Sequence, residues 1–343
     1  MAQSGALRGV ARQGGARARL ERFLPPIVGG LVLLVALVGL IGTAIRDPRP
    51  HDIPVGLVGP APVLQQMSAS FGAAAPGAFL FTSYGSEADA RSALDSRAVD
   101  GVLVLGGPRP RLVLAGAAGD GSVGVITAAF TNALKAQGMT VEVETVHPFA
   151  GGDAHGLILF FVVVAVLICS LVAQALFALN ASQAQFAERL AVVITFAVLA
   201  GITAMVTASW IAGGYGSGFW LAAGLVALGS AAIGAVVAGL AKIMGPAGVG
   251  LSGLFVVLLG LVTSGGPVGS QLLPDFYRAL APWMPAGPLY SALRGALYFD
   301  GAGIAVPAAV LAGWLVAGLV LMMAGEMIAR FRHASTSGTL TQE

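Results

Sequence analysis

Charged side chains and cysteine are both scarce in this sequence, and each scarcity excludes a class of protein. Only 10% of the 343 residues are charged, whereas about a quarter are charged in a soluble domain. The single cysteine, Cys169, lies inside an apolar run, so no disulfide framework is possible. The four histidines are scattered, which excludes a Cys/His zinc cluster. The net charge of +2 is too small and too dispersed for a nucleic-acid-binding surface, so nucleic acid is not expected as a partner.

The common catalytic motifs are missing as well. A P-loop needs lysine between glycine and Ser or Thr, but the two lysines, Lys135 and Lys242, follow Leu134 and Ala241. Neither G-x-S-x-G nor H-E-x-x-H occurs. We therefore expect no enzyme activity and no cofactor in this chain, and any ATP-driven work would require a separate ATPase subunit.

Long apolar runs are abundant instead. Six of them are long enough for a helix to cross a hydrocarbon core of about 30 Å, which predicts a mainly α, polytopic membrane protein with six transmembrane helices. The fifth run is the shortest and its start is crowded by glycines, so it is expected to be tilted, kinked or partly re-entrant. The first run exceeds the length of a signal-peptide core, which favours an uncleaved anchor. The expected spans are Phe23–Ile45, His155–Leu179, Leu190–Ala212, Phe219–Ala241, Val249–Ser264 and Ile304–Ile328.

Lys and Arg near the span ends predict the orientation. They occur in the arm 1–22, at Arg189, at Lys242 and in the tail 330–343, all on one side of an alternating six-span chain. That side should be the cytoplasm, with both termini inside. The composition, rich in Ala, Gly and Arg, suits a bacterial plasma membrane.

Segment 46–154, between the first two spans, has a different character, with seven Lys and Arg and ten Asp and Glu. Short apolar runs alternate with helical patterns, which predicts a small extracytoplasmic α/β domain. A five-helix transmembrane domain, 155–329, should follow. The predicted strands are Val55–Val58, Ala78–Phe81, Gly101–Leu105, Arg111–Leu114 and Thr140–Val146, and the predicted helices are Pro60–Phe71, Glu87–Ser96 and Ser122–Ala136.

A G-x-G-x-x-G motif at 119–124 follows a predicted strand and begins a predicted helix. Dinucleotide binding is one interpretation, with Glu142 or Glu144 as the ribose carboxylate. We favour a tight turn with Asp120 or Ser122 capping the helix, because Asp120 would face an anionic pyrophosphate and the chain has 49 glycines.

Polar and small residues within the spans suggest packing rather than chemistry. No ionisable residue lies near mid-membrane, which argues against a proton- or sodium-coupled carrier. Glu326 and Arg330, four residues apart, are expected to form an ion pair. A stripe of small residues on the fourth span predicts close helix packing, either within the chain or at a dimer seam. The stripe consists of Gly224, Ala227, Ala231, Gly234 and Ala238.

Two segments between spans are candidates for function. The polar connector Asn180–Leu190 is compatible with a short cytoplasmic helix and carries one large apolar side chain, Phe186, against which a motor subunit could push. The outer stretch 265–303 is cut by prolines into short amphipathic pieces, and its aromatics favour the membrane boundary. Arg294 needs an anionic or carbonyl partner there, for which Asp275 and Asp300 are candidates.

The residues of this outer region also carry a family resemblance. They read Ser-Gly-Gly-Pro at 264–267, Leu-Pro-Asp-Phe at 273–276, Pro-Trp-Met-Pro at 282–285 and Ala-Leu-Arg at 292–294. This resembles type-2 ABC-transporter permeases, particularly the branch that includes the phage infection protein, which share the order of one span, an outside domain and five spans.

The resemblance implies an export permease for an amphipathic or lipid-like substrate, acting as a homodimer or with a related permease, with an ATPase bound on the cytoplasmic side. Coupling would involve Gln185, Phe186, Glu188 and Arg189. An outer gate would involve Pro274, Phe276, Tyr277, Trp283, Pro285 and Arg294. The alternative is a non-transporting receptor or secretion-system component, in which the outside domain binds a ligand, phage or partner and the spans serve as an anchor.

Overall fold

A computed structural model describes residue 24 and residues 27–32, 34–44 and 46–339 of the chain. It consists of two compact units that divide after Asp47. The first contains the apolar helix Ile27–Ala44, and the predicted basic arm lies outside the described residues. The second unit holds a mixed sheet and a helical bundle. The described part of the chain is mainly helical and has six helices long and apolar enough to cross a membrane, as the sequence predicts.

The sheet has five strands in the order β2-β1-β3-β4-β5. β1 runs parallel to β2 and β3, β4 is antiparallel to β3, and β5 is parallel to β4. Their bounds confirm the predicted α/β segment to within a few residues. The strands are β1 (Ile53–Val58), β2 (Phe79–Tyr84), β3 (Gly101–Val104), β4 (Arg111–Ala115) and β5 (Glu142–Val146).

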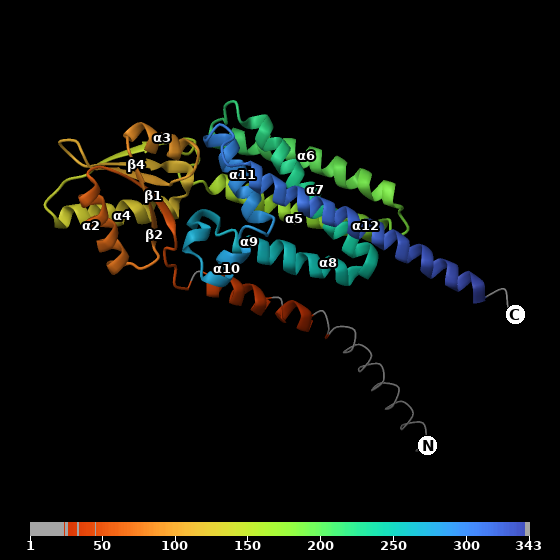
Figure 1. Ribbon diagram of the computed structural model, residues 1–343. Helices are drawn as coiled ribbons and strands as arrows, with labels where there is room; N and C mark the ends of the chain where they lie inside the picture. The colour runs from red at the N-terminus through yellow and green to blue at the C-terminus, as the bar shows by residue number, and fades with distance from the viewer. Residues whose placement is uncertain (1–23, 25–26, 33, 45, 340–343) are drawn as a thin grey trace, which may run out of the picture. The chain divides into compact units, whose positions relative to one another are not determined.

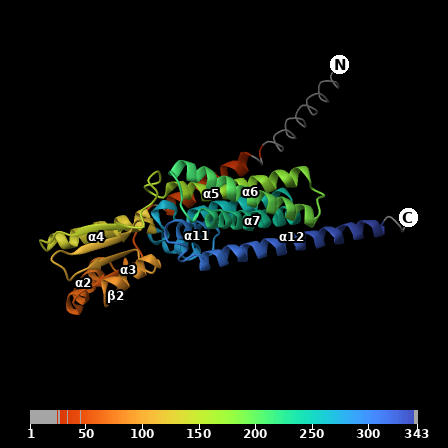
Figure 2. The same ribbon diagram turned by 90° about the horizontal axis from the view of Figure 1, so that it is seen from above.

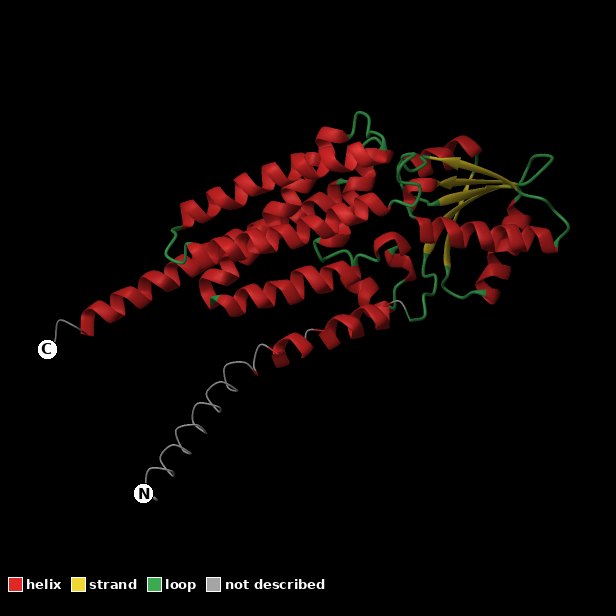
Figure 3. Ribbon diagram, turned by 180° about the vertical axis from the view of Figure 1, so that it is seen from behind, coloured by secondary structure: helices red, strands yellow, loops and turns green. Residues whose placement is uncertain are grey.

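Helices cover the two faces of this sheet differently. α2 (Ala61–Ala74) and α4 (Asp120–Ala136) pack on one face, over a core that includes Phe130. α3 (Glu87–Asp95) lies on the other face, where Phe299 from the bundle completes a second core. Figure 3 shows the yellow strands beside the red helices of the bundle. The α/β domain therefore shares part of its core with the bundle.

The bundle is built around one central helix (Figures 1 and 2). α7 (Phe219–Met244) contacts α5 (Leu157–Asn180), α6 (Phe186–Ala212) and α12 (Ala305–Thr339). Small residues permit these contacts, since a Cβ on Gly318 of α12 would lie 2.6 Å from the Cβ of Ala235 of α7. The bundle ends that adjoin the α/β domain are called proximal here, and the opposite ends distal.

The predicted small-residue stripe on α7 lies largely inside the chain. Ala227 packs against α6 near Gly201, Gly234 faces Gln174 and Val193, and Ala238 belongs to a cluster with Met322. The other two residues of the stripe are less buried. Ala231 is half-buried against that same cluster, and Gly224 is exposed, with no atom within 4 Å of its would-be Cβ. The closest α7–α12 approaches instead use Gly239 and Gly318, which a single-helix pattern does not reveal.

The fifth apolar helix departs from regular geometry just after the segment in which its glycines are concentrated. It runs from Pro246 to Thr263 as α8 (Pro246–Ser252), a π-helical segment (Gly253–Leu259) and α9 (Gly260–Thr263). The sequence predicts a tilted, kinked or partly re-entrant span here, and the π-helical segment is the irregularity that the structure contains.

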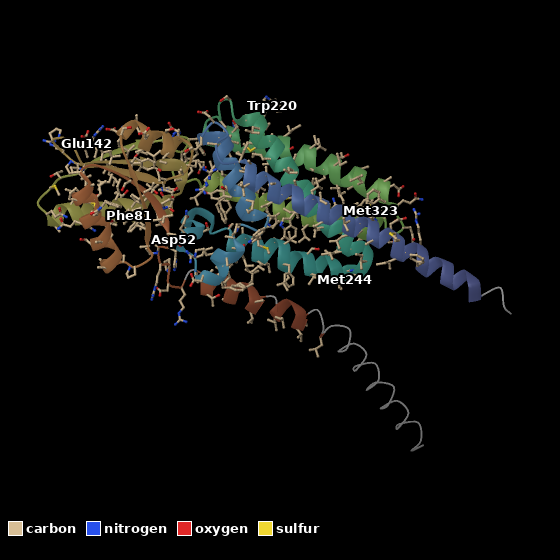
Figure 4. All side chains as sticks on the ribbon, in the orientation of Figure 1. Asp52, Phe81, Glu142, Trp220, Met244 and Met323 are labelled. Atoms are coloured by element: carbon tan, nitrogen blue, oxygen red, sulfur yellow. The ribbon has the colours of Figure 1, made fainter. Side chains whose placement is uncertain are left out.

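Apolar side chains cover the outward surface of the bundle. α5, α6 and α12 expose Leu, Ile, Val, Phe and Met along much of their length, and Figure 4 labels Trp220, Met244 and Met323 among the exposed residues. A water-facing surface of this size would be unfavourable. These helices are therefore suited to a lipid environment. Other exposed residues of this kind are Phe161, Leu176, Ile194, Val206, Val320 and Met327.

The outer stretch is less superficial than its sequence suggests. It contains two 3-10 turns (Gly266–Val268 and Ser270–Leu272), then α10 (Asp275–Leu280) and α11 (Ala286–Tyr298). α11 is not a surface helix, because Leu289, Tyr290 and Leu293 are buried in the bundle core and Leu289 packs on Gly229 of α7. The missing side chain at Gly229 leaves the space that Leu289 of α11 occupies.

Candidate functional sites at the two ends of the bundle

The distal connector between α5 and α6 is short and internally braced. Residues 181–185 form it, and α6 already begins at Phe186, so the separate short helix considered for Asn180–Leu190 is absent. Gln185 and Glu188 make a reciprocal capping box, in which the backbone N–H of Gln185 donates to Glu188 Oε2 at 2.9 Å. Two of the four predicted coupling residues therefore stabilise the start of α6.

Arg189 is buried beneath this connector. It is 3% exposed, and its Nε donates to the carbonyl oxygen of Ala184 at 3.1 Å while Nη2 donates to that of Ser182 at 3.0 Å. Lys242 of α7 donates to the same Ala184 carbonyl at 3.2 Å. The two cations hold the connector against the bundle, so Arg189 fixes its shape and does not present a charge to a partner.

The predicted ion pair near the end of α12 is present. Glu326 Oε1 lies 3.6 Å from Arg330 Nε, and Glu326 Oε2 lies 3.7 Å from Lys242 Nζ. The second contact links α12 to α7 and was not anticipated, because Lys242 is remote in sequence.

Phe186 also faces inward. It is half-buried against the cluster that contains Val193, Ala235 and Met322. The side chain is therefore not fully exposed, because the first turn of α6 directs it toward α7 and α12. The exposed side chains at this end include Ser182, Gln183, Gln185 and Glu188.

At the proximal end, the G-x-G-x-x-G segment is a docking surface for the outer stretch. Gly119 has a left-handed backbone (φ 136°), and a Cβ on Gly121 would lie 1.8 Å from the carbonyl oxygen of Val268. The predicted side-chain cap is wrong, since α4 has none. Asp120 instead lies 3.3 Å from His155, and Ser122 donates to Gln271 at 3.3 Å. A positive φ thus explains Gly119 and close packing explains Gly121, without a dinucleotide.

Phe299 joins the domain to the bundle at the end of α11. It is 3% exposed, its ring lies 4.7 Å from the His147 ring, and the Arg97 guanidinium lies 5.3 Å from its centroid. Phe149 and Tyr298 add an edge-to-face contact at 5.3 Å. Aromatic side chains from both parts therefore form a continuous interface.

A cavity of about 340 Å³ lies at this interface. We call it the junction cavity. Arg97, Asp100 and Ala118 line it from the α/β domain, Tyr290, Ser291 and Arg294 from α11, and Val306, Pro307 and Val310 from α12. It thus combines a charged wall with an apolar wall.

Two of the three arginines that line the junction cavity, Arg97 and Arg294, bind mainly to backbone carbonyls. Arg97 Nη1 donates to the carbonyl of Ser291 at 3.0 Å, and Nη2 donates to the Ser291 hydroxyl at 3.0 Å. Arg294 Nη1 donates to the carbonyl of Ala118, and its guanidinium lies 4.9 Å from the centroid of the Tyr290 ring. Arg294 therefore reaches into the α/β domain and finds a carbonyl partner, as expected, whereas the acidic candidates Asp275 and Asp300 are not the groups it contacts.

The remaining predicted gate residues take different positions. Pro274 and Pro285 precede α10 and α11, Tyr277 is buried, and Phe276 and Trp283 are exposed. Only Arg294 among the six lines the junction cavity. Arg97 and Asp100 were missed, because both lie in the α/β segment and only the folded chain brings them to α11.

Burial shifts the ionisation of the groups in this cavity. It lowers the pKa of Arg97 to about 10, with the nearby Arg294 charge adding to the effect. Burial raises the pKa of Asp100 to about 6, although both arginines oppose the shift. The Oδ2 atom of Asp100 is buried and has no hydrogen-bond partner among the described residues. Asp100 is consequently an unsatisfied acidic group of this site.

Replacing Asp100 by asparagine should stabilise the protein at neutral pH. A carboxyl group with a raised pKa favours folding while protonated, and that contribution is lost as the pH rises from about 4 to about 6. The shift corresponds to at most about 3 kcal/mol. Thermal unfolding of the detergent-solubilised protein should therefore show wild type gaining stability between pH 7 and pH 5, and Asp100→Asn lacking that gain. A lower unfolding midpoint for Asp100→Asn at pH 7 would contradict this assignment.

No cluster of metal-ligating side chains occurs among the residues that the structure describes. Comparisons with protein-family models, with curated proteins and with solved structures return no match.

Proposed function

We propose that the chain is the membrane-spanning permease subunit of an exporter driven by a separate ATPase, moving an amphipathic or lipid-like molecule outward across a bacterial plasma membrane. The observation that carries the proposal is the five-helix bundle with the buried α11 and the junction cavity at its proximal end. Anchoring an outside domain requires neither feature. This favours transport over the alternative of a receptor held by passive spans.

The distribution of side chains supports the orientation. Arg189, Lys242 and Arg330 lie at the distal end, and the five arginines of the basic arm precede the first span on the same side of an alternating chain. Trp210, Trp220 and Trp283 are exposed at the proximal end. Cytoplasmic loops are rich in Lys and Arg, and tryptophan favours the membrane boundary. These features support an orientation with the proximal end and the α/β domain on the outside.

The distal connector is the proposed contact for the ATPase. Its backbone is fixed by Arg189 and Lys242, so a push on the exposed side chains would pass to α5, α6 and α7. The chain itself carries no P-loop motif. A dimer with a second copy or a related permease would provide two such contacts.

A photo-crosslinking amino acid tests this contact. Introduced in place of Gln183 at the distal end, it should capture a protein that contains a P-loop, identified by mass spectrometry after purification in mild detergent. The same group in place of Gln137, exposed at the end of α4, is the matched control and should capture no ATPase. If positions 182, 183 and 187 all fail to capture an ATPase from native membranes, the receptor alternative is favoured instead.

A further inference from the structure

The junction cavity contains two arginines, Arg97 and Arg294, that form no ion pair in the part of the chain that the structure describes. Arg278, which also lines it, is paired with Asp52 at 2.7 Å and Asp275 at 2.9 Å. Arg97 and Arg294 share only Asp100, and neither lies within ion-pair distance of it among the described contacts. The Nε atom of Arg294 is buried without a hydrogen-bond partner. Buried arginine N–H groups of this kind are suited to an anionic oxygen.

The backbone around Arg97 is built to present its guanidinium. Arg97 has a left-handed conformation (φ 62°), a position after a helix that ordinarily favours glycine or asparagine. Glycines make space for its side chain, since a Cβ on Gly295 would lie 2.9 Å from Arg97 Nη1 and one on Gly303 would lie 3.3 Å from it. Strain at a residue other than glycine, held by surrounding contacts, is typical of ligand-binding positions.

The opposite wall of the cavity is apolar and continues onto the lipid-facing surface. Val306, Pro307 and Val310 of α12 line it, and Val306 is 75% exposed. Val316 and Val320 continue an exposed apolar face along the same helix. A molecule with an acidic head and an aliphatic tail would satisfy both walls at once. The cavity volume of about 340 Å³ suits a headgroup, while the tail would lie along α12 outside it.

We propose that the junction cavity binds the acidic headgroup of an anionic amphiphile, a phospholipid of the phosphatidylglycerol type, whose phosphate oxygens accept hydrogen bonds from Arg97 and Arg294. The role of this amphiphile as exported cargo rests on the proposed function, but its binding does not. Asp100 limits the affinity, because its carboxylate repels the phosphate. A lipid that enters from the outer leaflet and a lipid that arrives from the bundle would meet the same two guanidinium groups.

Calorimetric titration of the full chain in neutral detergent tests the proposal. The probes are short-chain phosphatidylglycerol, short-chain phosphatidylcholine and inorganic phosphate. We expect phosphatidylglycerol to bind at least tenfold more tightly than the other two. Arg97→Gln and Arg294→Gln should each weaken its binding about tenfold or more. Arg109→Gln, which removes an exposed arginine from the loop between β3 and β4, is the matched control and should leave the affinity unchanged.

Asp100→Asn separates a binding site from a merely structural cluster. It should tighten phosphatidylglycerol binding several-fold, a gain that a folding defect does not produce. Equal affinities of wild type for the two lipids would overturn the proposal. It would also be overturned if the single variants Asp100→Asn and Arg97→Gln both bound phosphatidylglycerol with the wild-type affinity. If inorganic phosphate bound as tightly as phosphatidylglycerol, the proposed amphiphile would be contradicted and the cavity would be a site for free phosphate. None of these results depends on an ATPase, so they leave the proposed transport function to its own test.

Discussion

Replacing Phe299 by alanine is expected to release the α/β domain from the bundle. The ring is 3% exposed and completes the core over α3, so its removal leaves a large cavity between two parts of the molecule. Truncating a buried phenylalanine costs about 3–5 kcal/mol. Trypsin should then cleave after Arg97 faster than in wild type, because the guanidinium loses its contacts with Phe299 and Ser291 when the interface opens.

Phe276→Ala is the matched control for this experiment. Phe276 is 63% exposed on α10, so the same truncation should change stability by no more than about 0.5 kcal/mol. Equal cleavage rates at Arg97 in the two variants would show that Phe299 does not hold the domain in place.

Replacing Gly318 by valine should disrupt the bundle itself. A Cβ at this position would lie 2.6 Å from the backbone nitrogen of Val236, so α12 must move away from the central helix α7. Overpacking costs about 1–3 kcal/mol when side chains can adjust. Here the obstacle is backbone, so we expect a loss of about 3 kcal/mol or more, seen as a much smaller monodisperse fraction in size-exclusion chromatography.

Gly313→Val provides the comparison on the same helix. Gly313 is exposed on α12 and has no atom within 4 Å of its would-be Cβ, while the change in helix propensity is the same. This variant should purify like wild type. If both variants purify equally well, the tight α7–α12 contact is not needed for the fold.

The elements of the fold could largely be predicted from the sequence, because each depends on a local pattern. Apolar run length locates the six long helices, and alternation with glycine, proline and aspartate locates the five strands to within a few residues. The depth of α11 could not be predicted in this way. Its aromatics and prolines are equally typical of a surface helix, and only its contact with Gly229 of α7 shows that it is buried.

The candidate sites could be predicted only in part, because side-chain direction and long-range contacts decide them. The sequence places a connector and an outer stretch between long apolar runs, but it does not show that Phe186 turns inward or that Arg294 contacts Ala118. No pattern in the sequence marks Arg97 as a site residue, because an arginine just after a short helix ordinarily lies in solvent. Its left-handed backbone and its distance of 194 residues from Ser291 are properties of the folded chain alone.

Cysteine accessibility tests most directly the orientation on which the proposed export and its coupling to an ATPase depend. Cys169 is first replaced by alanine, and a single cysteine is then introduced in place of Gln137 or Gln183, both exposed and at opposite ends of the second unit. On intact cells that produce the protein, an impermeant maleimide should label Gln137→Cys and should label Gln183→Cys only after permeabilisation. Labelling of Gln183→Cys on intact cells, alone or equally with Gln137→Cys, would contradict the account.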